Sequence, residues 1–264
     1  TMFLASQWLF ALPNGAMGQT TDPAAYRAAL QYRLLIAQLR VAKPCPRIGC
    51  TQTLDVYGYH SFSCQGTGNT LYGRHNNICK QLCLLANAAG LPTTYNAAAA
   101  HTPGFNPRTG GYRTFRPGDL FMPNENPPLL IDVTVVSPLA ASRVGTADIK
   151  YPGLMAANAA DKKHAYYDHA VSLDTKAFKA FAVDVTGFTD PDAVHLLRKI
   201  AGEYSATHAT AYSYAFAIVL RRVSFVIMRE LAQQLLFCSA SNAPPPPPAP
   251  PPPPALAGGG GVVT

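Results

Sequence analysis

The order of apolar segments along the chain predicts an α/β fold in which helices flank a mixed sheet. In the second half of the sequence, two strand candidates precede a helix, a third strand and two closing helices, at 118–122, 129–136, 153–171, 177–185, 190–205 and 206–237. Strands that alternate with helices typically build a sheet with helices on its faces. A short hairpin-like turn joins the first two strands and a helix precedes the third, so we expect a mixed sheet.

The segment 129–136 has the composition of a buried central strand. It reads Leu-Leu-Ile-Asp-Val-Thr-Val-Val, so only Asp132 and Thr134 interrupt the apolar run. A strand that is covered on both faces is continuously apolar rather than alternating. The preceding Pro-Asn-Glu-Asn-Pro-Pro at 123–128 is rich in turn residues and predicts the connection to 118–122.

Two further helices are expected in the first half of the chain. An Asp-Pro start signal at 22–23 precedes the range 24–42, in which leucines recur at helical spacing. A second helix over 74–89 ends at Gly90 and Pro92. The stretch 92–113 is rich in Ala, Gly, Thr and Pro, and we expect a loop there.

Composition divides the chain into four zones, which we expect to be a helical segment, a zinc knuckle, a main domain and a tail, at 1–44, 45–72, 73–238 and 239–264. The tail carries runs of proline and then of glycine, which favour polyproline II and cannot bury a core. We interpret it as a linker; use as a ligand for proline-binding modules is the alternative.

Bulk composition excludes several classes of protein. Of 264 residues, 48% are hydrophobic and 13% are charged, which is globular rather than disordered. The net charge of +7 favours a polyanionic partner such as nucleic acid. The sequence contains no continuous apolar stretch of the roughly 18 residues that a membrane span needs, and the apolar start at 2–12 lacks a basic region before it. We expect a soluble protein of the nucleus or cytoplasm, neither secreted nor membrane-bound.

Three cysteines and a histidine have the spacing of a small zinc site. They form the pattern Cys45-x4-Cys50-x9-His60-x3-Cys64, and three thiolates with one imidazole suit tetrahedral zinc. Tight turns are expected where Gly49 and Gly58 lie near the ligands, and Asp55 and Tyr57 between the two pairs are candidates to orient His60. The alternative is buried free cysteines beside a surface histidine. We expect Cys79 and Cys83, four apart on a helix, to be packing residues.

Two aspartates lie in or beside apolar strand candidates. Asp119 begins one strand and Asp132 lies within the next. A carboxylate in a strand interior is unfavourable unless it binds a metal or a fixed donor. Two such groups on neighbouring strands favour a site for Mg²⁺ or Mn²⁺ that activates water against a phosphodiester. Alternatively, Asp119 caps a turn and Asp132 pairs with an arginine.

The order of these motifs resembles a known family. The cysteine pattern is followed by Gly-Arg-His-Asn at 73–76, by Arg-Pro-Gly-Asp-Leu at 116–120 and by Ile-Asp-Val-Thr-Val-Val-Ser-Pro at 131–138. This looks like the C-terminal region of non-LTR retrotransposon reverse transcriptases, where a CCHC knuckle precedes a restriction-like endonuclease of the PD-(D/E)XK superfamily. The resemblance covers about 30–236 and no polymerase core.

The resemblance implies a magnesium- or manganese-dependent nuclease. Asp119 and Asp132 would bind the metal. Thr134 stands where the family has its lysine, so Lys163, or else Lys162, would supply that cation from the following helix. The competing interpretation is that both lysines belong to a solvated helix face. Gly118 also interrupts the Pro-Asp pair, and alanines occupy 97–100 where the superfamily often has a glutamate.

The family also implies a DNA partner, with element RNA and a reverse transcriptase polyprotein as further partners. Arg74 and His75 open a helix, whose N-terminus favours anions, and they join Arg108, Arg113 and Arg116 as candidates for gripping the DNA backbone. His75 is equally an ordinary surface histidine. We therefore expect an endonuclease that nicks target DNA during integration. The alternatives are a catalytically decayed nucleic-acid-binding module and, third, an interaction protein that uses its proline-rich tail.

Overall fold

A four-stranded mixed sheet forms the centre of the molecule. The computed structural model describes residues 4, 6–15, 18–66, 70–97, 102–106, 111–115, 118–140 and 151–240. The sheet contains β3 (Thr94–Tyr95), β6 (Leu120–Met122), β7 (Leu129–Val136) and β8 (Ala177–Asp184), in the order β3-β6-β7-β8. β6 pairs antiparallel with β3 and β7, whereas β7 and β8 are parallel. The predicted α/β class and mixed sheet are confirmed, and β7 is an interior strand as its composition indicated.

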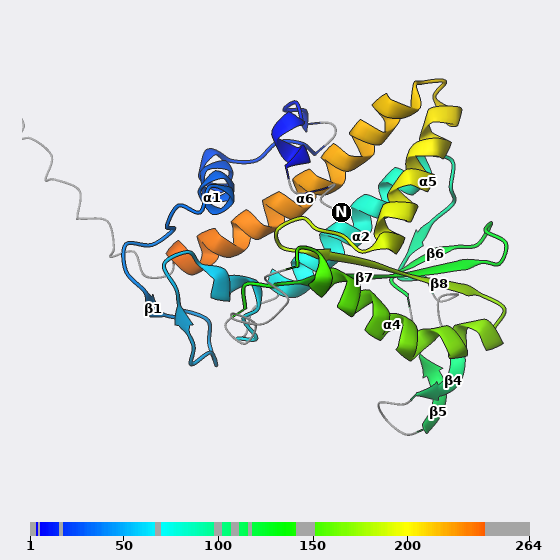
Figure 1. The fold of residues 1–264 in the computed structure, drawn as a ribbon, viewed down its shortest axis with the longest axis horizontal. Helices are drawn as coiled ribbons and strands as arrows, with labels where there is room; N and C mark the ends of the chain where they lie inside the picture. Colours follow the sequence, from blue (N-terminus) through cyan, green and yellow to red (C-terminus); the bar gives the residue numbers. More distant parts are fainter. Residues whose placement is uncertain are drawn as a thin grey trace, which may run out of the picture.

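Helices cover both faces of this sheet (Figure 1). On one face lies α4 (Leu154–Leu173), which links the parallel strands and packs small residues against them; Ala156 and Ala160 share a buried cluster with Leu130 and Ala180. On the other face lie α2 (Thr70–Ala88), α5 (Pro191–Thr207) and α6 (Tyr212–Ala240), which form the larger core with Ile131 and the rest of that strand face. Alternate residues of β7 therefore point to different helices.

The N-terminal helix is shorter than predicted. Helix α1 (Pro23–Arg33) begins after Asp22, whose carboxylate accepts the Ala25 N–H as an N-cap, but it ends where a helix to 42 was expected. Leu35 adopts a left-handed φ of 55°, and the Gln38 and Leu39 N–H groups bond to the Val56 carbonyl. The chain leaves the helix because it pairs with the cysteine-rich segment, so the predicted helix was wrong in its second half.

The N-terminal segment and the cysteine-rich segment both pack on the helical face of the main body. η1 (Gln7–Phe10) brings Trp8 to α6, where Ser224 Oγ accepts the Trp8 N–H and donates to the Leu4 carbonyl. The cysteine-rich segment contains β1 (Lys43–Pro44), β2 (Thr53–Leu54) and η3 (Tyr59–Phe62), and Phe62 is buried in the same core as Trp8.

Two other predictions need correction. The expected loop at 92–113 contains β3 and the start of a separate hairpin of β4 (Thr102–Asn106) with β5 (Gly111–Phe115). Threonine and aromatic residues suit strands. Neither pairing is complete within the expected loop, because β3 pairs with β6 and β4 pairs with β5, which extends to Phe115. The last helix begins at Tyr212, after Ala209 takes a left-handed φ of 49°. The tail from 241 to 264 lies outside the described residues.

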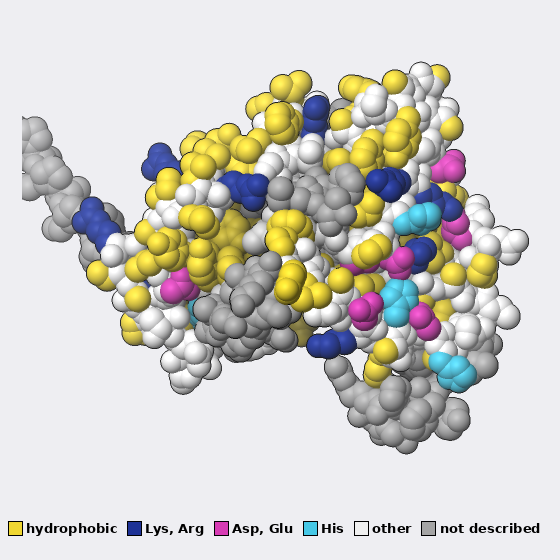
Figure 2. All heavy atoms as spheres, viewed as in Figure 1, with side chains coloured by type: hydrophobic (Ala, Val, Ile, Leu, Met, Phe, Trp, Pro, Cys, Tyr) yellow, Lys and Arg dark blue, Asp and Glu magenta, His cyan; other side chains and the backbone are white. Residues whose placement is uncertain are grey.

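Figure 2 shows where apolar side chains and charged side chains gather on one face of the molecule. Apolar side chains gather over α1 and α6, and several large ones are exposed, among them Leu34 and Leu35. Histidine, acidic and basic side chains gather over α4, β8 and the start of α5. Within the described part of the chain, no helix combines the length and apolarity that crossing a membrane requires.

Candidate metal centres

The four predicted zinc ligands converge. The Cys45 and Cys64 Sγ atoms are 3.6 Å apart, and Cys50 Sγ lies 3.2 Å from His60 Nε2. All four ligand atoms lie within 4.8 Å of one another. Tetrahedral zinc holds two thiolates roughly 3.8 Å apart and a thiolate roughly 3.6 Å from an imidazole nitrogen. The chemistry and spacing of this cluster, the zinc knuckle hereafter, therefore fit a zinc ion, and the knuckle could hold such a metal.

Local backbone geometry gathers these ligands. Gly49 and Gly58 have left-handed φ values of 79° and 76°, so both sharp turns occur where glycine allows them. The Asp55 carboxylate accepts the backbone N–H groups of Tyr57, Tyr59 and His60. Asp55 thus shapes the loop that presents His60, through its backbone rather than its ring.

The knuckle thiols have unequal acidity. Burial raises the pKa of the Cys64 thiol to about 11 and also raises that of Cys45. Burial acts in the same direction on Cys50, but the Gln52 N–H and the neighbouring thiols outweigh it and lower its pKa. A zinc ion bound by three thiolates forms a complex with one net negative charge. The buried Arg47 guanidinium is close enough to Cys50 for its positive charge to lower the pKa of that thiol.

The second centre is the carboxylate pair in the sheet. Asp119 and Asp132 are 6% and 8% exposed. Asp119 Oδ2 accepts the Val133 N–H at 2.9 Å and lies 3.0 Å from His75 Nε2. Asp132 Oδ2 lies 2.8 Å from Lys163 Nζ. His75 comes from α2 on one side of the sheet, and Lys163 comes from α4 on the other. Each carboxylate therefore has one basic side chain beside it, His75 at Asp119 and Lys163 at Asp132.

Burial and charge act together on these groups. Burial raises the pKa of Asp132 to about 6, although Lys163 opposes the rise and Asp119 adds to it. Burial lowers the pKa of Lys163, but the Asp132 carboxylate outweighs this and the net shift is upward. The hydrogen bond that His75 makes to the Asp119 carboxylate raises the pKa of His75 against its burial. The two aspartates therefore repel each other within one buried site.

Gly118 allows Asp119 to approach β7. A Cβ atom at Gly118 would lie 3.2 Å from the Ile131 backbone N and O and from Leu130 Cβ. Asp119, the next residue, lies directly against β7, because its N–H donates to the Ile131 carbonyl at 2.8 Å. Close packing beside the site thus favours the glycine that interrupts the Pro-Asp pair in the sequence.

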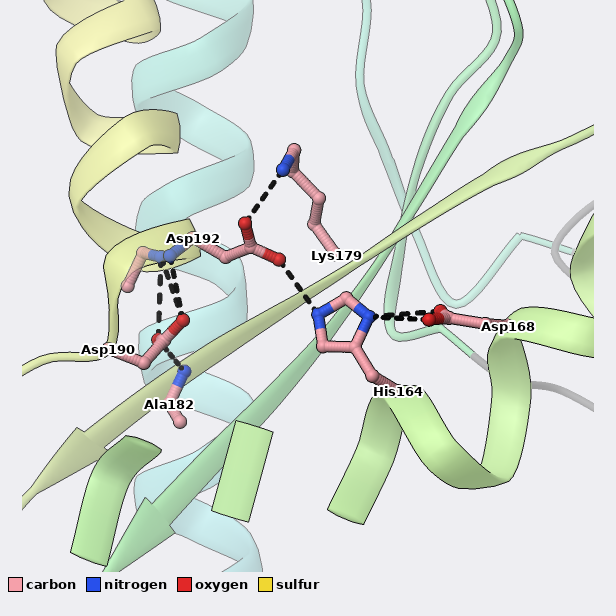
Figure 3. Close-up of polar contacts among 7 residues, drawn as sticks. His164, Asp168, Lys179, Ala182, Asp190 and Asp192 are labelled. Carbon is pink, nitrogen blue, oxygen red and sulfur yellow. Dashed lines mark hydrogen bonds and ion pairs between the residues drawn. The ribbon is translucent and has the colours of Figure 1, made fainter. Parts of the chain in front are cut away.

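Lys163, rather than Lys162, is the lysine that reaches the carboxylates, since Lys162 is exposed on α4. The next residue, His164, ties α4 to its neighbours (Figure 3). Its Nδ1 lies 2.9 Å from an Asp168 carboxylate oxygen and its Nε2 lies 2.9 Å from Asp192 Oδ2. The other Asp192 oxygen accepts from Lys179 at 2.7 Å. This network connects α4 to β8 and α5 beside Lys163.

The sequence analysis missed the His164 network. Its only local sign was the spacing of His164 and Asp168, four residues apart on one helix face. Asp192 and Lys179 come from other elements, and their contact with His164 depends on how α4 packs. Asp190 also contributes here, because its carboxylate caps α5 and accepts the Ala182 N–H (Figure 3).

The residues expected to contact DNA differ in their exposure to solvent, because Arg74 is buried and His75 is partly exposed. Arg74 is only 4% exposed, and its guanidinium donates to the Phe62 carbonyl and to Gln234 Oε1. It therefore joins η3 to α6 inside the protein, which corrects the expectation that it grips a phosphate. Arg116, Arg108 and the Arg113 side chain lie outside the described residues.

No protein-family model matches the chain, and no curated protein does either. The resemblance that the motifs suggested therefore stays a prediction.

Proposed function

We propose that this chain is a metal-dependent DNA endonuclease of the restriction-like type, from a non-LTR retrotransposon polyprotein, which nicks target DNA for integration. The observation that carries the proposal is that the buried Asp119 bonds to Ile131 and Val133, the two neighbours of the buried Asp132. Lys163 Nζ lies 2.8 Å from Asp132 Oδ2. Lys163 comes from the helix after β7, as expected for a lysine that has moved from the position of Thr134.

The donor set suits a hard divalent cation. Two carboxylates on adjacent strands offer oxygen ligands of the kind that Mg²⁺ and Mn²⁺ prefer. Their mutual repulsion, seen in the contribution of Asp119 to the raised pKa of Asp132, would be relieved by a positive ion between them. Bound Mg²⁺ would supply a Lewis acid that lowers the pKa of water and offsets charge on the phosphate.

The chain's own residues would have separate tasks. Asp119 and Asp132 would hold the ion, with Asp119 fixed in place by the Val133 N–H. Lys163 keeps its positive charge in the buried site because its pKa is raised, so it can orient an attacking water and stabilise negative charge. His75 lies beside the Asp119 carboxylate, and 30% of its side chain is exposed, so it can contact a bound backbone phosphate.

Nicking of supercoiled plasmid by the purified full chain with Mg²⁺ or Mn²⁺ tests this function. We expect nicking by the parent, none by Asp119→Asn or Asp132→Asn, and a loss of about 100-fold or more in Lys163→Ala. Asp161→Asn and Lys162→Ala are matched controls, because both residues are exposed on α4, and they should nick like the parent.

Two results would contradict the nuclease. Nicking that survives in both aspartate variants would come from another site or a contaminant. A parent that binds DNA in a salt-sensitive manner but does not nick it with either metal would be a binding module that keeps the fold and the knuckle.

A further inference from the structure

We propose that His75, Cys79 and Asp119 form a second transition-metal site, distinct from the zinc knuckle, that takes Zn²⁺. In the described part of the chain, these three residues form the other group whose ligand atoms all lie within 4.8 Å of one another. A soft thiolate and a borderline imidazole favour zinc over magnesium, and zinc also accepts a carboxylate as a further ligand.

Helix geometry brings two of the ligands together. His75 and Cys79 are four residues apart on α2, and this spacing places both side chains on one helix face. The Cys79 Sγ atom lies 3.8 Å from Nδ1 and 3.9 Å from Nε2 of His75. Asp119, the residue immediately before β6, completes the group with its Oδ2 atom 3.0 Å from His75 Nε2.

The surroundings of His75 are those of a metal ligand. Its Nδ1 lies 3.2 Å from the Asn76 side-chain oxygen, so an Nδ1–H group can donate there and leave Nε2 to bind a metal. Such outer hydrogen bonds fix the tautomer and orientation of histidine ligands. Asp119 is likewise held, by the Val133 N–H at 2.9 Å.

The site is closed on one side and open on the other. Cys79 is fully buried, whereas the His75 side chain is 30% exposed. A groove of about 340 Å³, lined by His75 together with Val133 and Thr134, leads to the histidine. An ion can therefore enter from the His75 side, and three protein ligands would leave a fourth position for water.

Zinc binding at this site would release protons from the ligand side chains. The ion would displace the proton that His75 Nε2 and Asp119 share and the proton of the Cys79 thiol, so two protons leave for each ion bound. Asp119 also belongs to the proposed magnesium site. If the proposed function holds, zinc at this second site removes Asp119 from magnesium and inhibits nicking.

Cobalt(II) tests the site without reference to nuclease activity. The full chain, with its knuckle already loaded with zinc, is titrated with Co²⁺ in the absence of DNA. We expect a near-ultraviolet thiolate-to-cobalt absorption band in the parent and in Cys83→Ala, the matched control one helical turn away. Cys79→Ala should lose the band and bind Co²⁺ at least about 100-fold more weakly than the parent. Asn76→Ala should bind Co²⁺ about tenfold more weakly than the parent.

No thiolate-to-cobalt band in the parent, or the same band in Cys79→Ala, would overturn the second site. Circular dichroism and thermal unfolding verify that Cys79→Ala is folded, and His75→Ala offers a second route because its side chain is partly exposed. The His75→Ala variant should also lose the band. Since no DNA is present, the result is separate from whether the chain nicks plasmid.

Discussion

Lys163 Nζ lies 2.8 Å from Asp132 Oδ2, so a helix on one face of the sheet supplies the cation for a carboxylate on the central strand. Asp132 is buried, and only the Lys163 side of the pair reaches solvent to an appreciable degree, with 32% of its side chain exposed. The pair therefore joins α4 to β7 whatever chemistry the site performs.

Replacing this lysine should destabilise the protein. We expect Lys163→Met to lower the free energy of unfolding by about 1–2 kcal/mol at neutral pH, because a buried carboxylate loses its partner while solvent screens part of the effect. Urea denaturation measures the change. Lys162→Met should stay within about 0.5 kcal/mol of the parent. Equal stability of the two variants would mean that the ion pair contributes nothing to folding.

Removing metal from the zinc knuckle should loosen the region around it. Phe62 of η3 is buried in the main core, so a chelator should lower Tm by about 5 °C or more. Cys50→Ser should melt at the lower temperature without chelator and show no further fall. Cys83→Ser, whose hydroxyl can still donate to the Thr93 carbonyl as the thiol does, should respond to chelator like the parent. A Tm that chelator leaves unchanged would argue against a structural ion.

The His164 network should make stability depend on pH. Burial lowers the pKa of His164, but Asp168 and Asp192 outweigh it, and the pKa in the folded protein lies above the ordinary 6.5. A raised histidine pKa contributes stability below the unfolded value, and that contribution is lost as pH rises through the folded value. We expect His164→Gln to be less stable than the parent by about 0.5–1 kcal/mol near pH 5.5 and nearly equal to it near pH 9. Denaturation at both pH values measures this, and a difference that grew with pH would contradict it.

Gly118→Ala should disturb the carboxylate pair from outside it. The added Cβ would meet the Ile131 backbone at 3.2 Å and push the segment of Asp119 away from β7. We expect a loss of about 1–2 kcal/mol in the free energy of unfolding and a fall in any nicking activity. Gly202→Ala is the control, because its Cβ meets nothing within 4 Å in the middle of α5. It should raise stability by about 0.5–1 kcal/mol.

The sequence alone was sufficient for the features that depend on near neighbours. Strand 129–136 was predicted with the bounds that β7 has, because an apolar run interrupted at only two positions marks a strand covered on both faces. The knuckle ligands lie within twenty residues of one another, and tight turns at Gly49 and Gly58 help to gather them. The mixed α/β order followed from the same local patterns.

Tertiary packing decided the rest. Helix α1 ends at Arg33, and the Val56 carbonyl accepts hydrogen bonds from the backbone that follows the helix. Arg74 is buried because its guanidinium bonds to both η3 and α6. His75 meets Asp119 across 44 residues of sequence, and Lys163 meets Asp132 across the face of the sheet. Local pattern gives the direction of a side chain on its own element, but contact between distant elements depends on how helices pack on each sheet face. The sequence therefore determined which residues could form the two centres, and only the packing decided which of them touch.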